Sequence, residues 1–128
     1  MARKGTHWKE VPDDHDYPAA ESYLMLLMRP SQAKRIVKRL QKAPIRHWKA
    51  KDLLRAARLP VLLRENIHVA ADLKKVSSGE ALSPVLLVRG HVEQGTPLQI
   101  ADGYHRICAS WYLNEDTDIP CRLVDTEK

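Results

Sequence analysis

Residues 98–106 read Leu-Gln-Ile-Ala-Asp-Gly-Tyr-His-Arg, an apolar strand that runs into a glycine turn and the start of a helix. Gly103 allows the backbone to turn tightly and to approach a ligand closely. The N-terminus of a helix exposes unpaired N–H groups and carries about half a positive charge, so it stabilises a bound anion. This stretch therefore predicts a phosphate site between a strand and a helix.

Three side chains of this stretch have chemistry that suits a phosphate. Arg106 can donate a fork of two hydrogen bonds, and His105 can donate one or transfer a proton. Asp102 can hold a metal ion that bridges phosphate groups. The same residues also fit a purely structural turn, in which Asp102 caps the helix and Arg106 is solvated. The spacing alone leaves both interpretations open.

The length and composition indicate one globular domain. The chain has 128 residues, no internal repeat and no apolar run of about 18 residues, so we expect one core and no membrane partner. The first residues lack the apolar segment of a signal peptide, which favours a cytoplasmic location. Cys108 and Cys121 lie among apolar neighbours, where free cysteines usually act as small buried hydrophobes, so no structural disulfide is expected.

The net charge of +5 hides an uneven distribution along the chain. Residues 29–64 contain twelve Lys or Arg residues and a single acid, Asp52, which gives this block a formal charge of +11. Such a block attracts polyanions, and nucleic acid is the commonest polyanion in a cell. The alternative is that these side chains form the solvated faces of two amphipathic helices. The sequence leaves both interpretations open.

The first 64 residues predict an arm followed by helices. Residues 1–17 have no apolar period, so we expect a mobile or loosely attached N-terminal arm. Their cluster Asp13-Asp14-His15-Asp16 offers metal ligands, although a closed site needs ligands from several elements. Helices are expected over 18–29, over 31–42 with Ser31 as N-cap, and over 49–58. Because they lack the apolar residues for a separate core, we expect residues 18–64 to form a basic helical extension packed on the core.

Residues 65–128 alternate between helical and strand patterns. A short helix ends near Gly79, two apolar strands form a hairpin, a helix follows Gly103, and a last strand follows Pro120. This order predicts an α+β core over 65–128. The expected elements are a helix over 69–76, strands over 85–88 and 98–101, and a strand over 121–124.

The elements from Glu65 to Asp125 resemble the ParB/sulfiredoxin superfamily, and in particular small bacterial ParB-like proteins of unassigned function. The likeness rests on Gly-x-x-x-x-Pro at 79–84 and on Asp-Gly-Tyr-His-Arg at 102–106, and it covers about half of the chain. It implies an α+β fold with a small mixed sheet and packed helices, preceded here by the helical extension. Members of the superfamily bind nucleotide phosphates at this turn.

The resemblance therefore implies a site for CTP, ATP or ADP, with Mg²⁺ held by Asp102. Two residues outside the turn are further candidates: His68 can line the same cleft or serve as a surface or capping group, and Ser83 precedes the strand where superfamily members contact nucleotide. The expected nucleotide contacts are Gly103, Tyr104, His105, Arg106, Ser83 and His68.

The chain departs from the known branches of the superfamily. Sulfiredoxins have a cysteine directly before the His-Arg pair, where this chain has Tyr104, so we expect no sulfinic-acid reductase activity. Partition ParB proteins carry a helix-turn-helix domain, which we do not expect here. Free-serine kinases have Asp-Gly-His-His-Arg and a separate glutamate as base, and Glu65 or Glu80 could supply that carboxylate.

Three hypotheses follow. The first is a nucleoside-phosphate-binding domain with its site at Asp-Gly-Tyr-His-Arg. The second is a phosphotransferase or nucleotide hydrolase at the same site, with Asp102 and His105 as the catalytic candidates and Arg106 stabilising the transferring phosphoryl group. The third is an accessory protein that binds DNA or RNA non-specifically through residues 29–64.

Overall fold

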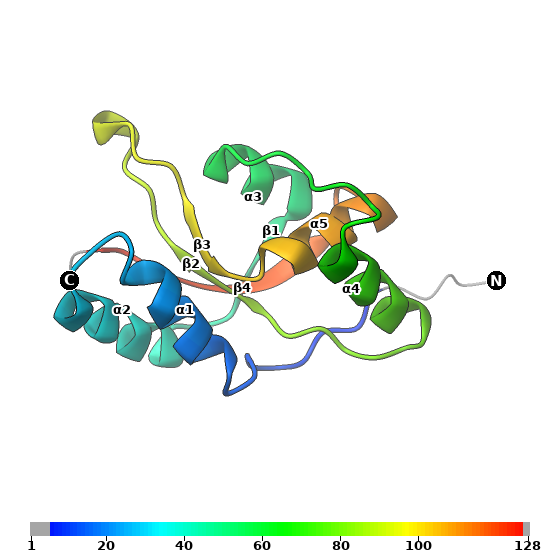
Figure 1. Ribbon diagram of the computed structural model, residues 1–128, viewed down its shortest axis with the longest axis horizontal. Helices are drawn as coiled ribbons and strands as arrows, with labels where there is room; N and C mark the ends of the chain where they lie inside the picture. Colours follow the sequence, from blue (N-terminus) through cyan, green and yellow to red (C-terminus); the bar gives the residue numbers. More distant parts are fainter. Residues whose placement is uncertain (1–5, 127–128) are drawn as a thin grey trace.

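The computed structural model describes residues 6–126, which form an α+β fold with five α-helices and a four-stranded mixed sheet (Figure 1). No helix in this part of the chain combines the length and the apolar composition that a membrane span requires. The elements in chain order are α1 (Asp16–Leu24), α2 (Pro30–Lys42), β1 (Arg46–Lys49), α3 (Ala50–Ala57), α4 (Ile67–Ser77), β2 (Val85–Val88), the 3-10 helix η1 (Val92–Gln94), β3 (Gln99–Asp102), α5 (Tyr104–Leu113) and β4 (Asp118–Val124).

The sheet has the strand order β1-β4-β2-β3. Strand β2 pairs antiparallel with β3, as the predicted hairpin requires, and parallel with β4. Strand β1 pairs antiparallel with β4 at the edge of the sheet, and it lies inside the segment predicted to be helical. Its sequence, Arg-His-Trp-Lys, exposes three of four residues and shows no apolar alternation. Because an edge strand is defined by its partner, local sequence gave no signal for it.

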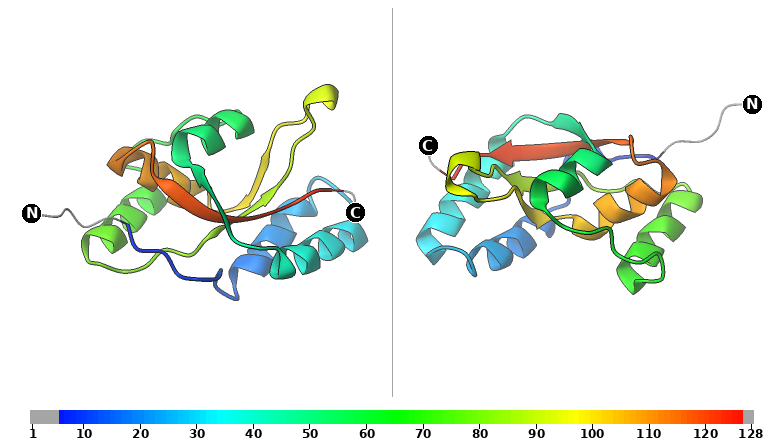
Figure 2. Two further views of the ribbon diagram at one scale, coloured as in Figure 1. Left: turned by 180° about the vertical axis from the view of Figure 1, so that it is seen from behind. Right: turned by 90° about the horizontal axis from the view of Figure 1, so that it is seen from above.

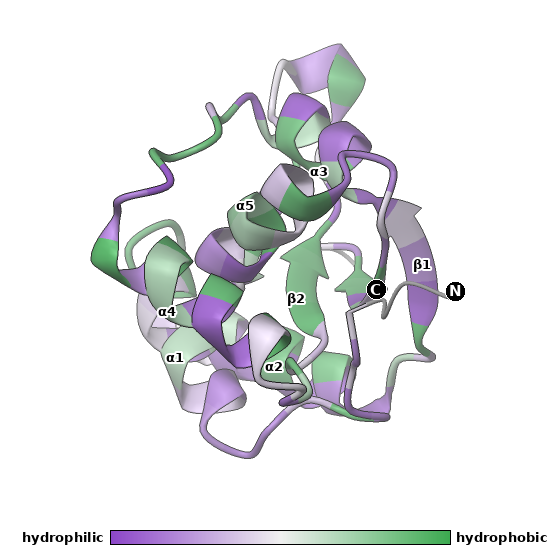
Figure 3. Ribbon diagram, turned by 90° about the vertical axis from the view of Figure 1, so that its right-hand side faces the viewer, coloured by the Kyte–Doolittle hydropathy of each residue, from purple (hydrophilic) through white to green (hydrophobic). Residues whose placement is uncertain are grey.

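Helices cover both faces of the sheet (Figure 2). Helices α1 and α2 pack on one face, α3 and α5 pack on the other, and α4 packs against α5. Successive side chains of β2 point to opposite faces, so Val85 and Leu87 enter one core and Leu86 and Val88 enter the other. Two covered faces explain why β2 is apolar at every position (Figure 3).

The helices of the basic block bury the apolar side chains that their spacing predicts. Helix α2 buries Ala33, Ile36, Val37 and Leu40, and α3 buries Ala50, Leu53, Leu54 and Ala57. Because α2 and α3 lie on opposite faces of the sheet, the basic block is divided between two surfaces.

The predicted N-cap of α2 is wrong. The helix begins at Pro30, with Arg29 in the cap position and no side-chain capping bond. Proline suits the first turn of a helix because its φ is preset and its missing N–H needs no acceptor. Ser31 therefore lies inside the helix rather than before it.

The prediction of a loosely attached arm is wrong for residues 6–17. The backbone around Trp8 pairs with Leu82, through Lys9 N–H to Leu82 O and Leu82 N–H to His7 O, both at 2.8 Å. Asp16 begins α1 and is only 4% exposed. These contacts reach across most of the chain, so no local period could reveal them. The first five residues of the predicted arm lie outside the described residues.

The helical extension predicted over 18–64 is part of the same folded unit as residues 65–126. Strand β1 belongs to the sheet, and α3 shares a hydrophobic core with α5. The β1 pairing also makes this extension partly strand rather than wholly helical.

Candidate functional site

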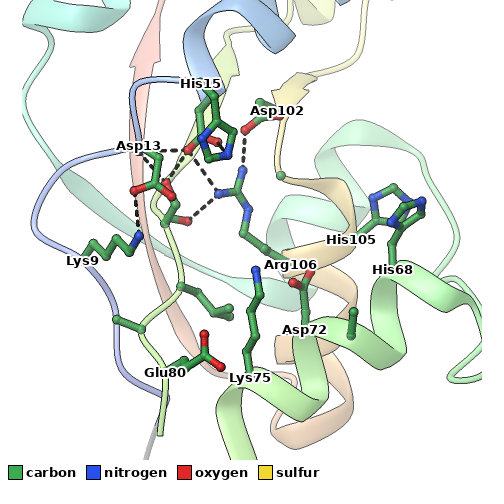
Figure 4. A pocket seen from close by; sticks show the side chains of 16 residues that line it. Lys9, Asp13, His15, His68, Asp72, Lys75, Glu80, Asp102, His105 and Arg106 are labelled. Carbon is green, nitrogen blue, oxygen red and sulfur yellow. Dashed lines mark hydrogen bonds and ion pairs between the residues drawn. The ribbon is translucent and has the colours of Figure 1, made fainter. Parts of the chain in front are cut away.

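A cavity of about 570 Å³ opens at the start of α5 (Figure 4). Four parts of the chain form it: the N-terminal segment, α4, the loop before β2 and the turn from β3 to α5. The described residues that line it are Lys9, Asp13, His15, Asp16, His68, Ala71, Asp72, Lys75, Glu80, Ala81, Leu82, Ser83, Asp102, Gly103, His105 and Arg106.

The structure brings six of the seven predicted site residues to this cavity. Tyr104 is the exception, because its hydroxyl donates a 2.6 Å hydrogen bond to the carbonyl of Pro60 and its ring packs against the core. The structure therefore does not bring the Tyr104 side chain to the cavity that the other six residues line. Of the two glutamates considered as a base, Glu80 lines the cavity and Glu65 does not.

Arg106 is the centre of the hydrogen-bond network. Its Nη2 donates to Asp102 Oδ2 at 2.5 Å, and its Nη1 donates to Ser83 O at 3.0 Å and to Asp16 Oδ2 at 3.3 Å. The side chain is only 13% exposed. Both terminal nitrogens thus already donate to protein acceptors, and the predicted contact between Arg106 and phosphate would use the N–H donors that remain. Asp16, one of these acceptors, comes from the distant N-terminal segment.

The two carboxylates beside Arg106 compete for one positive charge. Burial raises the pKa of Asp102 to about 6, and the nearby Asp16 also raises it, whereas the Arg106 guanidinium lowers it. Asp16 accepts a second hydrogen bond, from Ser83 Oγ, and a third from the N–H of Asp13. This cluster is a structural clamp that joins the N-terminal segment to α5.

The same clamp limits how its carboxylates can hold a metal ion. Asp102 and Asp16 each use one oxygen as an acceptor within the clamp, so each keeps its other oxygen for the metal predicted at Asp102 or for another cation. A second possible donor set is Asp13, His15 and Asp16, which offer one ligand atom each within 4.8 Å of one another. Carboxylate oxygens suit Mg²⁺ or Mn²⁺, and the imidazole suits Mn²⁺ better than Mg²⁺. One oxygen of Asp13 is already paired with Lys9 at 2.7 Å.

Two histidines and an aspartate form the opposite wall of the cavity. The rings of His68 and His105 lie with their centroids 4.7 Å apart. Burial lowers the pKa of His105, and His68 lowers it further, although Asp72 opposes this. Burial also raises the pKa of Asp72. Burial on this wall therefore favours the neutral forms of both His105 and Asp72.

Asp72 and Lys75 were not predicted as site residues. They lie four and seven positions after His68 on α4, which is the spacing of one helical face. That signal was present in the sequence once His68 was placed at the cavity. Asp13 and Asp16 belong to the acidic cluster that the sequence offered as metal ligands, whereas Lys9 had no signal, because it lies in the segment predicted to be loose.

The start of α5 is open toward this cavity. Its first backbone hydrogen bond joins Ile107 N–H to Gly103 O, and no side chain in residues 6–126 caps the helix from its N-cap position. Asp102, the predicted cap, accepts from Arg106 instead. Unpaired N–H groups with the positive end of the helix dipole favour an anion at this point.

The charges around the cavity are mixed. Five carboxylates and three Lys or Arg side chains line it among the described residues. Groups of both signs lie on each side of it: Lys9 and Asp13 on the N-terminal segment, and Asp72 and Lys75 on α4 (Figure 4). This arrangement suits a ligand that carries both an anion and a cation better than it suits a free anion.

Both cysteines lie outside this cavity and are buried. Burial raises the pKa of the Cys108 thiol, and it raises the pKa of Cys121 to about 12. Thiols with raised pKa values are poor nucleophiles at neutral pH.

No family model, curated protein or solved structure matches this chain. The cavity combines the uncapped start of α5 with His68, His105 and Lys75 among its lining side chains.

Proposed function

We propose that the cavity binds a nucleoside phosphate together with a divalent cation. The open start of α5 carries the proposal, because it offers backbone donors and a helix dipole at one end of a 570 Å³ cavity. That volume lies within the usual range for small-ligand sites. The resemblance of the Asp-Gly-Tyr-His-Arg turn to the ParB/sulfiredoxin superfamily supports the same ligand class, and we propose that the chain belongs to it.

The lining residues divide naturally between the two parts of such a ligand. His105 lies in the first turn of α5 and Lys75 lines the cavity from α4, so they would add donors and positive charge for the phosphates. Asp13 and Asp16 would contribute oxygen ligands to the cation. The cation would offset the excess of carboxylates, which by themselves would repel a free phosphate.

A phosphotransferase or nucleotide hydrolase activity is the second candidate, and Asp72 favours it. This carboxylate is half-buried, lines the cavity and lies near His105. A raised pKa brings a carboxylate closer to the range in which a general base works at neutral pH. Asp72 therefore replaces Glu65 as a candidate base, and Glu80 remains on the cavity wall.

We predict that CTP, ATP, ADP or GTP with Mg²⁺ raises the melting temperature of the protein. A ligand at about 100 times its dissociation constant adds roughly 2.7 kcal/mol of stability, which corresponds to several degrees. The variants His105→Ala and Lys75→Ala should lose most of the shift, because they remove donors beside α5. Differential scanning fluorimetry with and without Mg²⁺ measures the shift in melting temperature.

Lys74→Ala is the matched control, because Lys74 is exposed on the same helix and does not line the cavity. It should keep the full shift. A complete lack of shift at millimolar nucleotide would contradict the proposal. A shift that survives both His105→Ala and Lys75→Ala would place the nucleotide elsewhere. Arg106 is left intact because it holds the fold together.

Non-specific binding of DNA or RNA is a third candidate, and it now rests on α2 rather than on all of residues 29–64. Helix α2 carries five basic residues and no acidic residue. On the other face of the sheet, Lys51 pairs with Asp116 at 2.9 Å and Arg55 pairs with Asp52 at 3.1 Å. Those pairs leave less free positive charge around α3, which favours the solvated-face interpretation there.

We predict that replacing Lys34, Arg35, Lys38 and Lys42 by Gln abolishes weak nucleic-acid binding. Non-specific dissociation constants should be about 10⁻⁴ to 10⁻⁶ M at physiological salt and should rise steeply with salt. Arg39 is kept, because it donates to the carbonyl of Asp125 at 2.7 Å. Fluorescence anisotropy with a labelled duplex measures the affinity.

A triple Gln variant of Lys49, Lys51 and Arg55 removes three positive charges, against four in the α2 variant, and should bind almost as well as the wild type. Equal losses in the two variants would show attraction to overall charge rather than to α2. If the wild-type protein fails to bind even at about 50 mM salt, where counterion release is most favourable, α2 is simply a solvated surface.

A further inference from the structure

A second cavity, of about 450 Å³, lies between α3 and the loop of the β2–β3 hairpin. These two elements rise on the same side of the sheet (Figure 1). The cavity shares no lining residue with the first one. Its apolar lining comes from three strands, from α3 and from the hairpin loop, and its large side chains are Trp48, Leu53, Leu87, Val92, Leu98 and Leu123.

Three arginines surround this apolar floor, against one acid, Asp52. In residues 6–126, each of these arginines places one nitrogen on a protein acceptor. Arg55 Nη2 pairs with Asp52 at 3.1 Å, Arg58 Nη1 donates to Gly95 O at 3.1 Å, and Arg89 Nε pairs with Asp125 at 2.7 Å. These bonds position the guanidinium groups while their other N–H donors stay available for an anion.

Arg58 is also held in an unusual backbone conformation. It ends α3 with φ 58° and ψ 38°, and it is the one non-glycine residue with positive φ in the described part of the chain. Glycine adopts this conformation with less strain and is the usual residue at such a helix end. An arginine in this conformation costs backbone free energy that a glycine would not, and its side chain lies at the rim of the cavity.

We propose that this groove binds an organic carboxylate with an apolar body, such as a medium-chain fatty acid. The apolar floor removes the hydrocarbon chain from water, and the arginine rim receives the carboxylate through charge-assisted hydrogen bonds. The volume suits a small ligand. Charge complementarity selects a carboxylate over a neutral or cationic head group. This inference does not depend on the nucleotide cavity.

Isothermal titration calorimetry with three probes that share a ten-carbon chain tests the proposal. Decanoate should bind, decanol should bind at least tenfold more weakly, and decyltrimethylammonium should not bind, all below their micelle-forming concentrations. Arg58→Gly should melt at a higher temperature than the wild type, because strain is relieved, and yet bind decanoate at least tenfold more weakly. If Arg58 had only a structural role, its replacement would not raise the melting temperature and weaken the binding of decanoate at the same time.

Arg55→Gln is the second rim variant, since its largely exposed side chain can be replaced without loss of the fold. Arg35→Gln, on the opposite face of the sheet, is the matched control and should bind decanoate like the wild type. Equal affinity for decanoate and decanol would overturn the proposal, as would full affinity in both rim variants. Absence of binding together with a dimer in sedimentation would assign the groove to a second copy of the chain.

Discussion

Gly103→Ala is expected to destabilise the protein by about 3 kcal/mol, because the substitution combines backbone strain with overpacking. Gly103 has φ 114°, which L-residues rarely adopt. An added Cβ would lie 2.8 Å from the Cβ of buried Val85, closer still to its Cγ1, and 2.9 Å from Arg106 Nη2. Urea denaturation of the wild type and the variant measures the difference in the free energy of unfolding.

Gly79→Ala separates the two contributions. Gly79 has φ 84°, and an added Cβ there meets nothing within 4 Å, so this variant should show the backbone cost alone, about 1 kcal/mol. The double variant Gly103→Ala with Val85→Ala should recover the packing part of the loss. Equal destabilisation by Gly79→Ala and Gly103→Ala would show that the Val85 side chain moves away from the added Cβ without a loss of stability. That result would contradict the packing argument.

Arg106→Met is expected to destabilise the protein by about 3 kcal/mol at pH 8, because it leaves two buried carboxylates without their cation. The side chains of Asp16 and Asp102 are only 5% and 19% exposed. The expected loss of stability is smaller at pH 5 than at pH 8. Chemical denaturation of the wild type and the variant at both pH values measures the difference in the free energy of unfolding.

The sign of this pH dependence follows from the raised pKa of Asp102. Its pKa is about 6 in the folded protein against an ordinary value of 3.8, so the folded state binds more protons than the unfolded state between these values. Without Arg106 the pKa rises further. The variant then gains stability relative to the wild type as the pH falls and Asp102 becomes neutral.

Two further variants check the clamp. Asp16→Asn in the Arg106→Met background should restore part of the lost stability, since it removes one of the unpaired charges. Arg35→Met, on the exposed face of α2, should change stability by less than about 0.5 kcal/mol. A deficit of Arg106→Met that is the same at pH 5 and pH 8 would show that lost packing, rather than unpaired charge, causes it.

These two residues show why the Asp-Gly-Tyr-His-Arg turn supports two interpretations from sequence. Gly103 is required by the contact with Val85, and Arg106 is required by the two carboxylates. The presence of both residues is therefore explained by contacts within the fold, without a ligand. The case for a phosphate site rests on the neighbours of this pair, which are the uncapped start of α5, His105 and Lys75.

The sequence by itself determined the features that depend on neighbouring residues. Helical spacing identified the buried faces of α2 and α3, and apolar runs with turn residues identified β2, β3 and their hairpin. The glycine turn located the start of α5. These predictions succeed because the periods of helices and strands bring residues a few positions apart onto the same face.

Only the tertiary structure decided which distant segments meet. Strand β1 exists through its pairing with β4, the basic block is divided by the sheet, and Asp16 reaches Arg106 across 90 residues of sequence. Tyr104 turns to the carbonyl of Pro60 instead of to the cavity. The physical reason is that hydrogen bonds and ion pairs between remote groups depend on how the elements are packed. That packing is a property of the whole chain and leaves no local period in the sequence.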